Sequence, residues 1–426
     1  MLEILAIFLA FCFGALAYHN LLKALALLIF LLPSYLWRLS FFGLPSSFLE
    51  LLILALFLIF LIKDQNWRKF NFFQAKENLL SKKWQALLFL WLLASLFALF
   101  VNFNFSSLGL WRAYFLEPMM VFLVFIYAIN KEKDLKLIYL SFSALLFSLF
   151  AIALFQALTA WNLPAAYDFP NPRRLTTLFS YPNALALFVA PLAIFLLSLA
   201  KIVQNQKERI IYFISAIMGF LLLIFARSEG AILALVIALF IFIFKKLRKN
   251  LERAIIFAAS AFVLFFTPLK VYFYKIFGDL LWPNSEYFTS SLAVRGLQWQ
   301  ETFALLHDHW FFGAGINGYQ KMMAIYHQIT WLEIFLYPHN IFLNFWVELG
   351  LFGLLIFIGL LFFIFKTCWQ LIKNQNILAW PLTLAWLTIL IHGLVDVPYF
   401  KNDLSVLFFI FLALLIIAQK QGKAQG

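Results

Sequence analysis

Long apolar runs separated by short polar stretches recur along the whole chain. A helix that crosses the roughly 30 Å hydrocarbon core of a membrane needs about 20 mostly apolar residues, and most of these runs approach that length. The pattern therefore predicts an all-α polytopic bundle of thirteen transmembrane helices. Their approximate positions are 2–17, 21–36, 47–63, 84–101, 113–129, 136–158, 183–200, 209–226, 230–245, 253–268, 341–365, 378–395 and 404–418.

The first apolar run has an alternative interpretation as a signal peptide. It ends in Ala15-Leu16-Ala17, which resembles a small-residue cleavage site. A signal peptide begins with positive charge, however, whereas this run carries Glu3 and no Lys or Arg. We expect a membrane helix here, and cleavage would leave twelve.

One long polar interval, residues 269–338, separates the tenth and eleventh runs. We expect it to be an extracytoplasmic loop within a single integral-membrane domain that spans 1–426. Between Leu292 and Trp310 the apolar residues follow helical spacing, which predicts an amphipathic helix on the membrane surface. The segment Gly313–Gly318 fits GxGxxG formally, but no strand precedes it, so a turn is predicted instead of a dinucleotide site.

Composition agrees with the membrane prediction. Hydrophobic residues make up 65% and charged residues 12% of the chain, and the mean hydropathy is +0.93. A soluble domain has roughly 45–50% apolar and about 25% charged residues. Cys12 and Cys368 lie far apart in the sequence, so no disulfide framework or thiolate metal site is implied. The net charge of +13 first reports orientation in such a chain, and no nucleic-acid partner is expected.

The basic residues favour one orientation. With the basic loop 64–83 in the cytoplasm and the sides alternating, most Lys and Arg fall inside, the N-terminus lies outside and the C-terminus inside. Among the basic residues left outside, arginine is over-represented: six of the ten arginines but only four of the twenty-two lysines lie there. These arginines are Arg38, Arg112, Arg173, Arg174, Arg227 and Arg295.

Topology alone does not favour arginine over lysine in this way. The planar guanidinium binds phosphate with two hydrogen bonds, which an ammonium group cannot do. We therefore hypothesise that some of the outer arginines hold a diphosphate. The alternative is that they extend to lipid headgroups at helix ends.

Several acidic and histidine residues on the predicted outer side are candidates for chemistry. Glu117 is ionisable near membrane depth, which is by default functional, although an ion pair with Arg112 explains it equally well. His392 and Asp396 have the spacing of one helix face. His307-Asp308-His309 lacks the ligand pattern of a metal site, and we expect no metal.

The candidate base is His339, in Pro338-His339-Asn340, where the long polar interval meets an apolar segment. An imidazole titrates near neutral pH, and at the mouth of a membrane helix it is placed to act on a lipid-carried polar substrate.

These residues resemble the O-antigen ligase and polymerase superfamily of membrane glycosyltransferases. His339-Asn340, followed after nine residues by Gly350-x-x-Gly353, is similar to that family's ligase signature. Arg295 with Trp299, and the segment 309–315, look like the start of the same conserved region. The stretch from Arg174 through Asn183 looks like the family's central motif, and the resemblance covers about 165–415.

The resemblance implies a glycosyltransferase that moves a glycan from an undecaprenyl-diphosphate carrier to an acceptor hydroxyl on the outer face of the cytoplasmic membrane, with inversion and without metal or nucleotide cofactor. The donor, a lipid or glycan acceptor and membrane lipids are the implied partners. The expected catalytic residues are His339, Arg295, Arg227 and Glu229, and the expected substrate-binding residues are Arg173, Arg174, Asn183, Asn340, Trp299 and Asp396.

One departure and three alternatives remain open. The family has Ser-Arg-Gly where this chain has Ser228-Glu229-Gly230, so Arg227 either replaces the missing arginine or the role is lost, and Glu229 is a rival base. Ligase, polymerase and protein-glycosylating enzymes share these motifs. The other functional classes are a solute transporter, which would use Glu117 and Asp396, and a structural scaffold.

Overall fold

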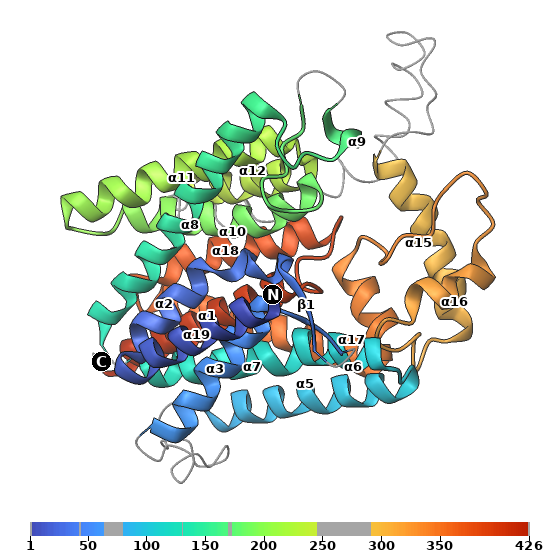
Figure 1. Cartoon of the computed structure of the whole chain (residues 1–426), viewed down its shortest axis with the longest axis horizontal. Coiled ribbons are helices and arrows are strands. Elements are labelled where there is room, and N and C mark those ends of the chain that lie inside the picture. The colour runs from blue at the N-terminus through green and yellow to red at the C-terminus, as the bar shows by residue number, and fades with distance from the viewer. Residues whose placement is uncertain are drawn as a thin grey trace.

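The structure, a computed structural model, describes residues 2–41, 44–63, 80–129, 131–168, 173–244 and 291–424. Helices dominate these residues (Figure 1). The longer ones are α1 Leu2–His19, α2 Leu21–Phe30, α3 Phe48–Ile62, α5 Lys82–Val101, α6 Phe105–Trp111, α7 Glu117–Ala128, α8 Glu132–Thr159, α10 Pro182–Ala200, α11 Gln206–Ala226, α12 Glu229–Phe244, α15 Ser291–Asp308, α16 Tyr319–Tyr326, α17 Ile341–Lys373, α18 Ala379–Gly393 and α19 Asn402–Ala424.

The predicted polytopic bundle is confirmed. Eight helices in the described part of the chain are long and apolar enough to cross a membrane, and α2, α3, α12 and α18 are shorter apolar helices. Twelve of the thirteen predicted segments coincide with helical residues, and the remaining one, 253–268, lies outside the described residues. The second segment, 21–36, is only partly α-helical, because Pro33 follows α2 and a short 3₁₀ turn, η1 Leu32–Leu36, takes its place.

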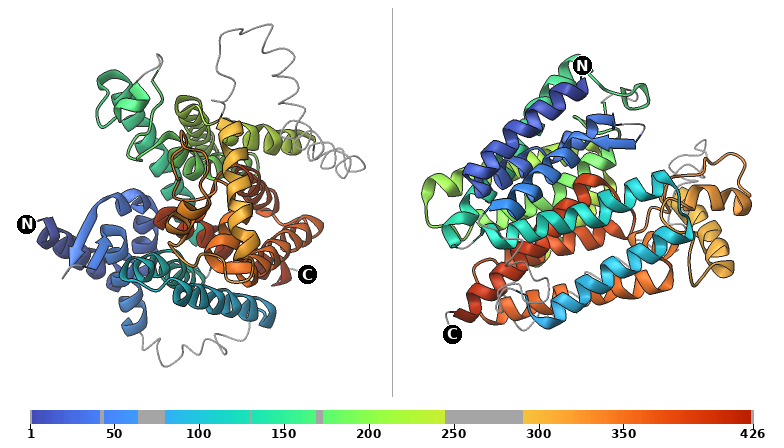
Figure 2. Two further views of the ribbon diagram at one scale, coloured as in Figure 1. Left: turned by 90° about the vertical axis from the view of Figure 1, so that its right-hand side faces the viewer. Right: turned by 60° about the horizontal axis from the view of Figure 1, so that its bottom comes forward.

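The core of the bundle is built on α10 and α19. Of their apolar windows, 89% and 94% are buried, more than in the other candidate spans of the described residues. α10 packs against α11 and α18, while α19 packs against α7. Both helices begin at the end of the bundle that also carries α15 and α16, and the first view in Figure 2 looks onto that end, which we call the site end.

Two local irregularities lie toward the site end. Strands β1 Arg38–Phe41 and β2 Leu44–Ser47 form an antiparallel hairpin that the sequence pattern did not predict. Between α6 and α7 the helix widens into a π turn, η3 Arg112–Leu116. Such a turn frees backbone carbonyls, and here two of them accept hydrogen bonds, that of Tyr114 from the Tyr399 hydroxyl (2.6 Å) and that of Ala113 from the Ser405 hydroxyl (3.2 Å).

The loop that enters α17 is partly described. The helix predicted between Leu292 and Trp310 is confirmed as α15, and the predicted turn over 313–318 is confirmed between α15 and α16, while the placement of α15 on the membrane surface stays a prediction. Residues 269–290 of the expected loop lie outside the described residues.

Helix α17 is interrupted at Gly350, whose φ of 69° and ψ of −176° are not helical. The Leu351 N–H donates to the Phe311 carbonyl (3.0 Å), and the Val347 carbonyl accepts from the Ala314 N–H (2.7 Å). In a continuous helix Leu351 and Val347 would bond to each other. The helix therefore exchanges this bond for two bonds to the turn that follows α15. A Cβ added at Gly350 would lie 2.3 Å from the Phe311 carbonyl oxygen, so only glycine fits.

Candidate functional site

The loop that carries His339 is anchored to α15. The Gln298 amide donates to the Tyr337 carbonyl (2.7 Å), and the Trp299 indole donates to the Pro338 carbonyl (2.8 Å). His339 itself has a φ of 46°, in the left-handed region that a non-glycine residue rarely adopts. These contacts give Trp299 a positioning role, because its side chain fixes the backbone next to the histidine.

Asn340 directly follows the histidine and starts α17. Its side-chain oxygen accepts hydrogen bonds from the N–H groups of Phe342 (2.9 Å) and Leu343 (3.1 Å), which makes it the N-cap of the helix. Its amide nitrogen donates to the Leu394 carbonyl (3.0 Å). The donor and the acceptor of the side chain are thus engaged within the protein, and Asn340 ties the His339 loop to the end of α18.

Asp396, in the loop between α18 and α19, is the centre of the predicted site residues. It is only 1% exposed. Its Oδ2 lies 3.8 Å from Nη2 of Arg295, on α15, and accepts a hydrogen bond from the Asn183 amide, on α10, at 3.4 Å. Its Oδ1 accepts from the Val397 N–H (2.9 Å). Three segments far apart in sequence thus meet at one carboxylate.

His339 completes this group through electrostatic interaction with both Asp396 and Arg295. Burial lowers the pKa of His339 below its ordinary value, and Arg295 lowers it further, while Asp396 acts in the opposite direction. The imidazole is therefore neutral near pH 7 and able to accept a proton. Its Nδ1 is buried and has no hydrogen-bond partner among the residues that the structure describes.

The charge of Asp396 is set by its neighbours. Burial acts to raise the pKa of this carboxyl, but His339, His392, Arg295 and the Val397 N–H together outweigh burial and hold the pKa below its ordinary value. Asp396 is therefore an anion that keeps Arg295 in place. His392 is the last but one residue of α18, so it shares no helix face with Asp396, contrary to the sequence expectation, although the two groups do interact.

A second group of predicted residues meets at the turn between α11 and α12. Arg174 donates from Nε to the Ala226 carbonyl (3.3 Å) and from Nη2 to the Arg227 carbonyl (3.5 Å), and it also interacts with the charges of Arg227 and Glu229. Arg227 ends α11 with a φ of 51°, and both Arg227 and Glu229 are exposed. Two guanidinium groups therefore lie near each other at the surface.

Gly230 connects this second group to the first. A Cβ added at Gly230 would lie 2.8 Å from Cγ2 of Val395 and 3.3 Å from Nε2 of His392. The first turn of α12 can approach the end of α18 only because residue 230 has no side chain. The Arg227–Glu229 turn is thus held close to the loop that carries Asp396.

Two predicted residues are explained by local structure. Arg173 pairs with Asp168 (2.5 Å) and donates to the Ala157 carbonyl (2.8 Å), so its guanidinium has partners other than those of Arg174. Glu117, the ionisable residue near membrane depth, pairs with Arg112 (2.9 Å), which also contacts Glu50.

Sequence reasoning missed residues that lie next to the histidine. The hydroxyl groups of Tyr181 and Tyr337 share a hydrogen bond, and the Tyr337 ring centroid lies 5.0 Å from that of His339. Nζ of Lys401 lies 4.0 Å from the centroid of the Tyr181 ring. Lys401 belongs to the short polar loop that also holds Asp396, and that shared loop was the available signal. The tyrosines carried no signal because tyrosine is common at membrane interfaces.

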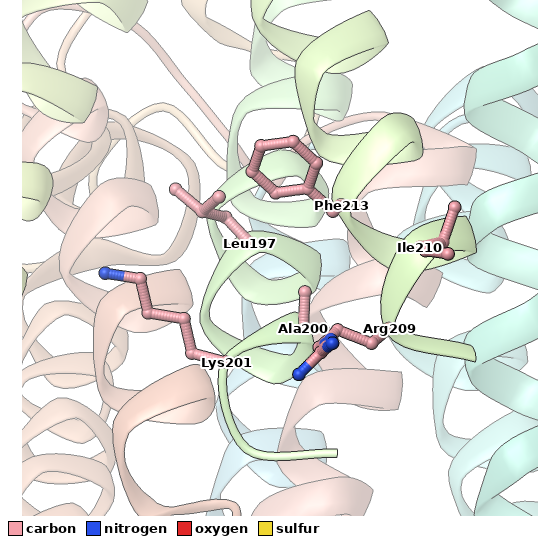
Figure 3. Close-up of a pocket in the computed structure, with 6 residues that line it drawn as sticks. All are labelled: Leu197, Ala200, Lys201, Arg209, Ile210 and Phe213. Carbon is pink, nitrogen blue, oxygen red and sulfur yellow. The ribbon is translucent and has the colours of Figure 1, made fainter. Parts of the chain in front are cut away.

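A cavity of about 430 Å³ lies elsewhere, at the far end of α10 and the start of α11 (Figure 3). It is lined by Leu197, Ala200, Lys201, Arg209, Ile210 and Phe213. Asn183 starts α10 and Lys201 follows its end, so the length of the helix separates this cavity from Asp396. The lining has cations and apolar groups but no residue that could act as a base, and we do not assign the chemistry to it.

Comparison with known families supports a function for the site end. Residues 213–358, about a third of the chain, match the family model described as O-antigen ligase. The matched stretch is shorter than the 165–415 expected from motifs, but it contains Arg227, Glu229, Arg295 and His339. A search of curated proteins found no match.

The apolar helices and the family match point to the same kind of protein. Eight described helices are long and apolar enough to cross a membrane, and the matched family is described as O-antigen ligase. The chain is a multi-pass membrane protein, and its residues 213–358 are similar to the O-antigen ligase family, a likeness that supports activity of the ligase or polymerase type in general.

Proposed function

We propose that the protein transfers a glycan from an undecaprenyl-diphosphate carrier to an acceptor hydroxyl at the extracytoplasmic face of the cytoplasmic membrane. The observation that carries the proposal is the meeting of His339, Arg295 and Asp396 at the site end. A base, a guanidinium and its fixed counter-charge are the groups that displacement of a diphosphate by a hydroxyl needs.

In the proposed reaction the acceptor oxygen attacks the anomeric carbon of the donor sugar. The bond from that carbon to the diphosphate oxygen breaks as the new glycosidic bond forms, so the configuration inverts. The acceptor proton passes to the neutral imidazole of His339, and the diphosphate leaves with the electron pair of the broken bond. One base of this kind contributes roughly 10²–10⁴-fold to the rate.

The arginines take the negative charge that develops on the leaving diphosphate. Arg295 lies beside His339 and shares Asp396 with it. Arg174 and Arg227 lie together at the neighbouring turn, which Gly230 brings close to Asp396. We propose that Arg227 supplies the guanidinium that the family places one residue before the glycine, where this chain has Glu229. The guanidinium groups then stabilise the charge of the leaving diphosphate, a role that a metal ion has in other enzymes.

Glu229 is the rival base, since it lies at the same turn. It is exposed, whereas the His339 ring is partly buried beside Arg295 and Asp396. A base works best at the place where the reacting groups are screened from water. This favours His339 as the base and leaves Glu229 to orient Arg174.

The transporter alternative depended on Glu117 and Asp396. Each has structural partners, Arg112 for Glu117 and Arg295 with Asn183 for Asp396. Neither acid requires a transported ion to explain its charge. The polymerase alternative uses the same residues and differs only in its acceptor.

The test is an assay with purified protein in lipid nanodiscs and a polyprenyl-diphosphate-linked glycan. A ligase forms a product on a second lipid or saccharide acceptor, and a polymerase forms a longer lipid-linked chain. We expect one of these products from the wild type and neither from His339→Ala. Absence of transfer by the wild type with both kinds of acceptor, or equal transfer by His339→Ala, overturns the proposal.

A further inference from the structure

A further group of charges lies beside the loop that carries Asp396. It consists of Arg38 at the start of β1, Lys401 just before α19 and Asp403 in the first turn of α19. Lys401 and Arg38 both interact electrostatically with Asp403. Arg38 was among the outer arginines considered for a diphosphate, whereas Lys401 and Asp403 were not predicted site residues.

Tyrosines connect the group of Arg38, Lys401 and Asp403 to the histidine. The Tyr337 ring packs beside His339, its hydroxyl bonds to that of Tyr181, and Lys401 lies over the Tyr181 ring. Cζ of Arg38 lies 5.6 Å from the centroid of the Tyr35 ring. Two cation–tyrosine pairs thus lie near the proposed base, and Tyr35 interacts electrostatically with Tyr181 and Tyr337.

The two cations of this group are accessible to solvent, whereas the acid is buried. Asp403 is fully buried (0% exposed), whereas Arg38 is exposed and Lys401 is only partly buried. The backbone N–H groups of Asp403 and Leu404 stabilise its carboxylate. Its position in the first turn of α19 is also favourable to the helix dipole. The acid therefore acts as a buried counter-charge that orients Lys401.

The two cation groups are linked to the base through different residues. Arg174 and Arg227 are joined through Gly230 and His392 to Asp396. Lys401 is joined through Tyr181 and Tyr337 to His339, and it interacts with the charges of Arg38 and Asp396. In an inverting displacement the leaving group and the attacking group lie on opposite sides of the reacting carbon, so they need separate binding groups. If the first group of cations holds the donor diphosphate, the second is left for the acceptor.

We propose that Lys401 and Arg38, above the rings of Tyr181 and Tyr35, bind an acidic group carried by the acceptor saccharide. This inference rests on the proposed function and adds a substrate class to it, namely an acceptor with a phosphate or carboxylate near the accepting hydroxyl. The cations bind the anion, and tyrosine rings offer flat apolar faces on which a sugar ring packs. Asp403 is a positioning residue for Lys401.

The experiment measures binding without turnover, so that its outcome is independent of transfer. The protein in phosphatidylcholine nanodiscs is titrated with glucose 6-phosphate, glucuronate, glucose and inorganic phosphate, and binding is followed by saturation-transfer NMR. We expect the two acidic sugars to bind at least tenfold more tightly than glucose or inorganic phosphate. The ratio between glucose 6-phosphate and glucuronate tells which acidic group the site prefers.

Variants place the binding on the structure. Lys401→Met and Arg38→Gln should each weaken the binding of both acidic sugars about tenfold or more, whereas Lys401→Arg retains it. Arg209→Gln, in the cavity at the far end of α10, should leave it unchanged. The inference is overturned if Arg174→Gln and not Lys401→Met removes binding, if glucose binds as well as the acidic sugars, or if inorganic phosphate binds as tightly as glucose 6-phosphate. Failure of the proposed function would instead appear as absence of transfer from the lipid-linked donor.

Discussion

The Asp396 carboxylate lies 3.8 Å from the Arg295 guanidinium, and the pair joins the loop before α19 to the helix that precedes the histidine loop. The side chain of Arg295 is 13% exposed and that of Asp396 is 2% exposed. A largely buried pair of this kind holds each partner in a fixed direction, because an uncompensated buried charge is costly. Arg295 therefore presents a fixed guanidinium beside His339, which is the relationship on which the proposed chemistry depends.

Replacement of Arg295 by lysine tests the guanidinium. Arg295→Lys keeps the charge but loses the planar fork that binds phosphate with two hydrogen bonds. We expect a loss of roughly 1.5–3 kcal/mol of transition-state binding, about ten- to a hundredfold in kcat/KM. Arg209→Lys, in the cavity at the far end of α10, is the matched control and should leave the rate unchanged. Equal rates for Arg295→Lys and the wild type contradict the assignment.

Removal of the imidazole tests the base. His339→Ala should lose roughly 10²–10⁴-fold in kcat while the protein still inserts and elutes as a single species. His307→Ala is the control, since the side chain of His307 is 88% exposed and hydrogen-bonded to its neighbour Asp308. If Glu229→Gln abolishes transfer while His339→Ala remains active, the two roles must be exchanged.

The pH profile follows from the environment of His339. A base must be unprotonated, and burial with Arg295 lowers the pKa of His339 below 6.5. Log kcat/KM should therefore stay level as pH falls through 6.5 and decline only at lower pH. Asp396 raises the pKa of His339, so Asp396→Asn should move this acid limb to still lower pH, whatever its effect on the maximal rate. An acid limb that moves upward in Asp396→Asn contradicts the arrangement.

Binding of an acidic sugar should weaken at alkaline pH. Burial lowers the pKa of Lys401 to about 8, although Asp403 and Asp396 oppose the shift, while Arg38 adds to it. The ammonium is charged below this value, so the affinity for glucuronate should fall as pH rises through about 8. Lys401→Arg should remove this fall, because a guanidinium stays charged. Tyr181, whose pKa burial raises well above its ordinary value, remains neutral throughout. A fall that persists in Lys401→Arg assigns the titration to another group.

The break in α17 predicts a stability effect. Gly350→Ala would place a Cβ 2.3 Å from the Phe311 carbonyl oxygen at a φ of 69°, and strain of this kind costs on the order of 1–3 kcal/mol. Gly359→Ala lies in the same helix, where an added Cβ meets only Cδ1 of Leu87 at 3.9 Å. We expect thermal unfolding to shift downward for Gly350→Ala and to stay level or rise for Gly359→Ala. Equal melting temperatures contradict the close contact.

The fold could be predicted from the sequence to a large extent, and the reason is physical. Apolar runs in a membrane must form helices, because lipid offers no hydrogen-bond partner to the backbone. Some helix ends also follow from residue type: Pro182 starts α10, where its missing N–H costs no hydrogen bond. The hairpin β1–β2 and the π turn at Arg112 were not accessible, because they depend on contacts such as that between Tyr399 and Tyr114.

The site was only partly predictable. His339 and Arg295 carry recognisable spacing, and both meet Asp396 in the structure. Arg173 and Arg174 are adjacent in sequence and look equivalent, but Arg173 pairs with Asp168 and Arg174 donates to the α11–α12 turn. Lys401 lies over Tyr181, more than two hundred residues earlier, and no local pattern encodes such a pair.

The break at Gly350 divides α17 into two parts that are oriented by different contacts. The residues before Gly350 are bonded through Val347 to the turn after α15, whereas the residues beyond it pack as an ordinary membrane span. One residue inserted into a continuous helix rotates everything beyond it by about 100°. An insertion after Gly353 would therefore rotate the rest of α17 against its neighbours. The orientation of His339, at the start of the helix, would not change. The length of the membrane-spanning part of α17 and the orientation of the His339 side chain can therefore vary independently.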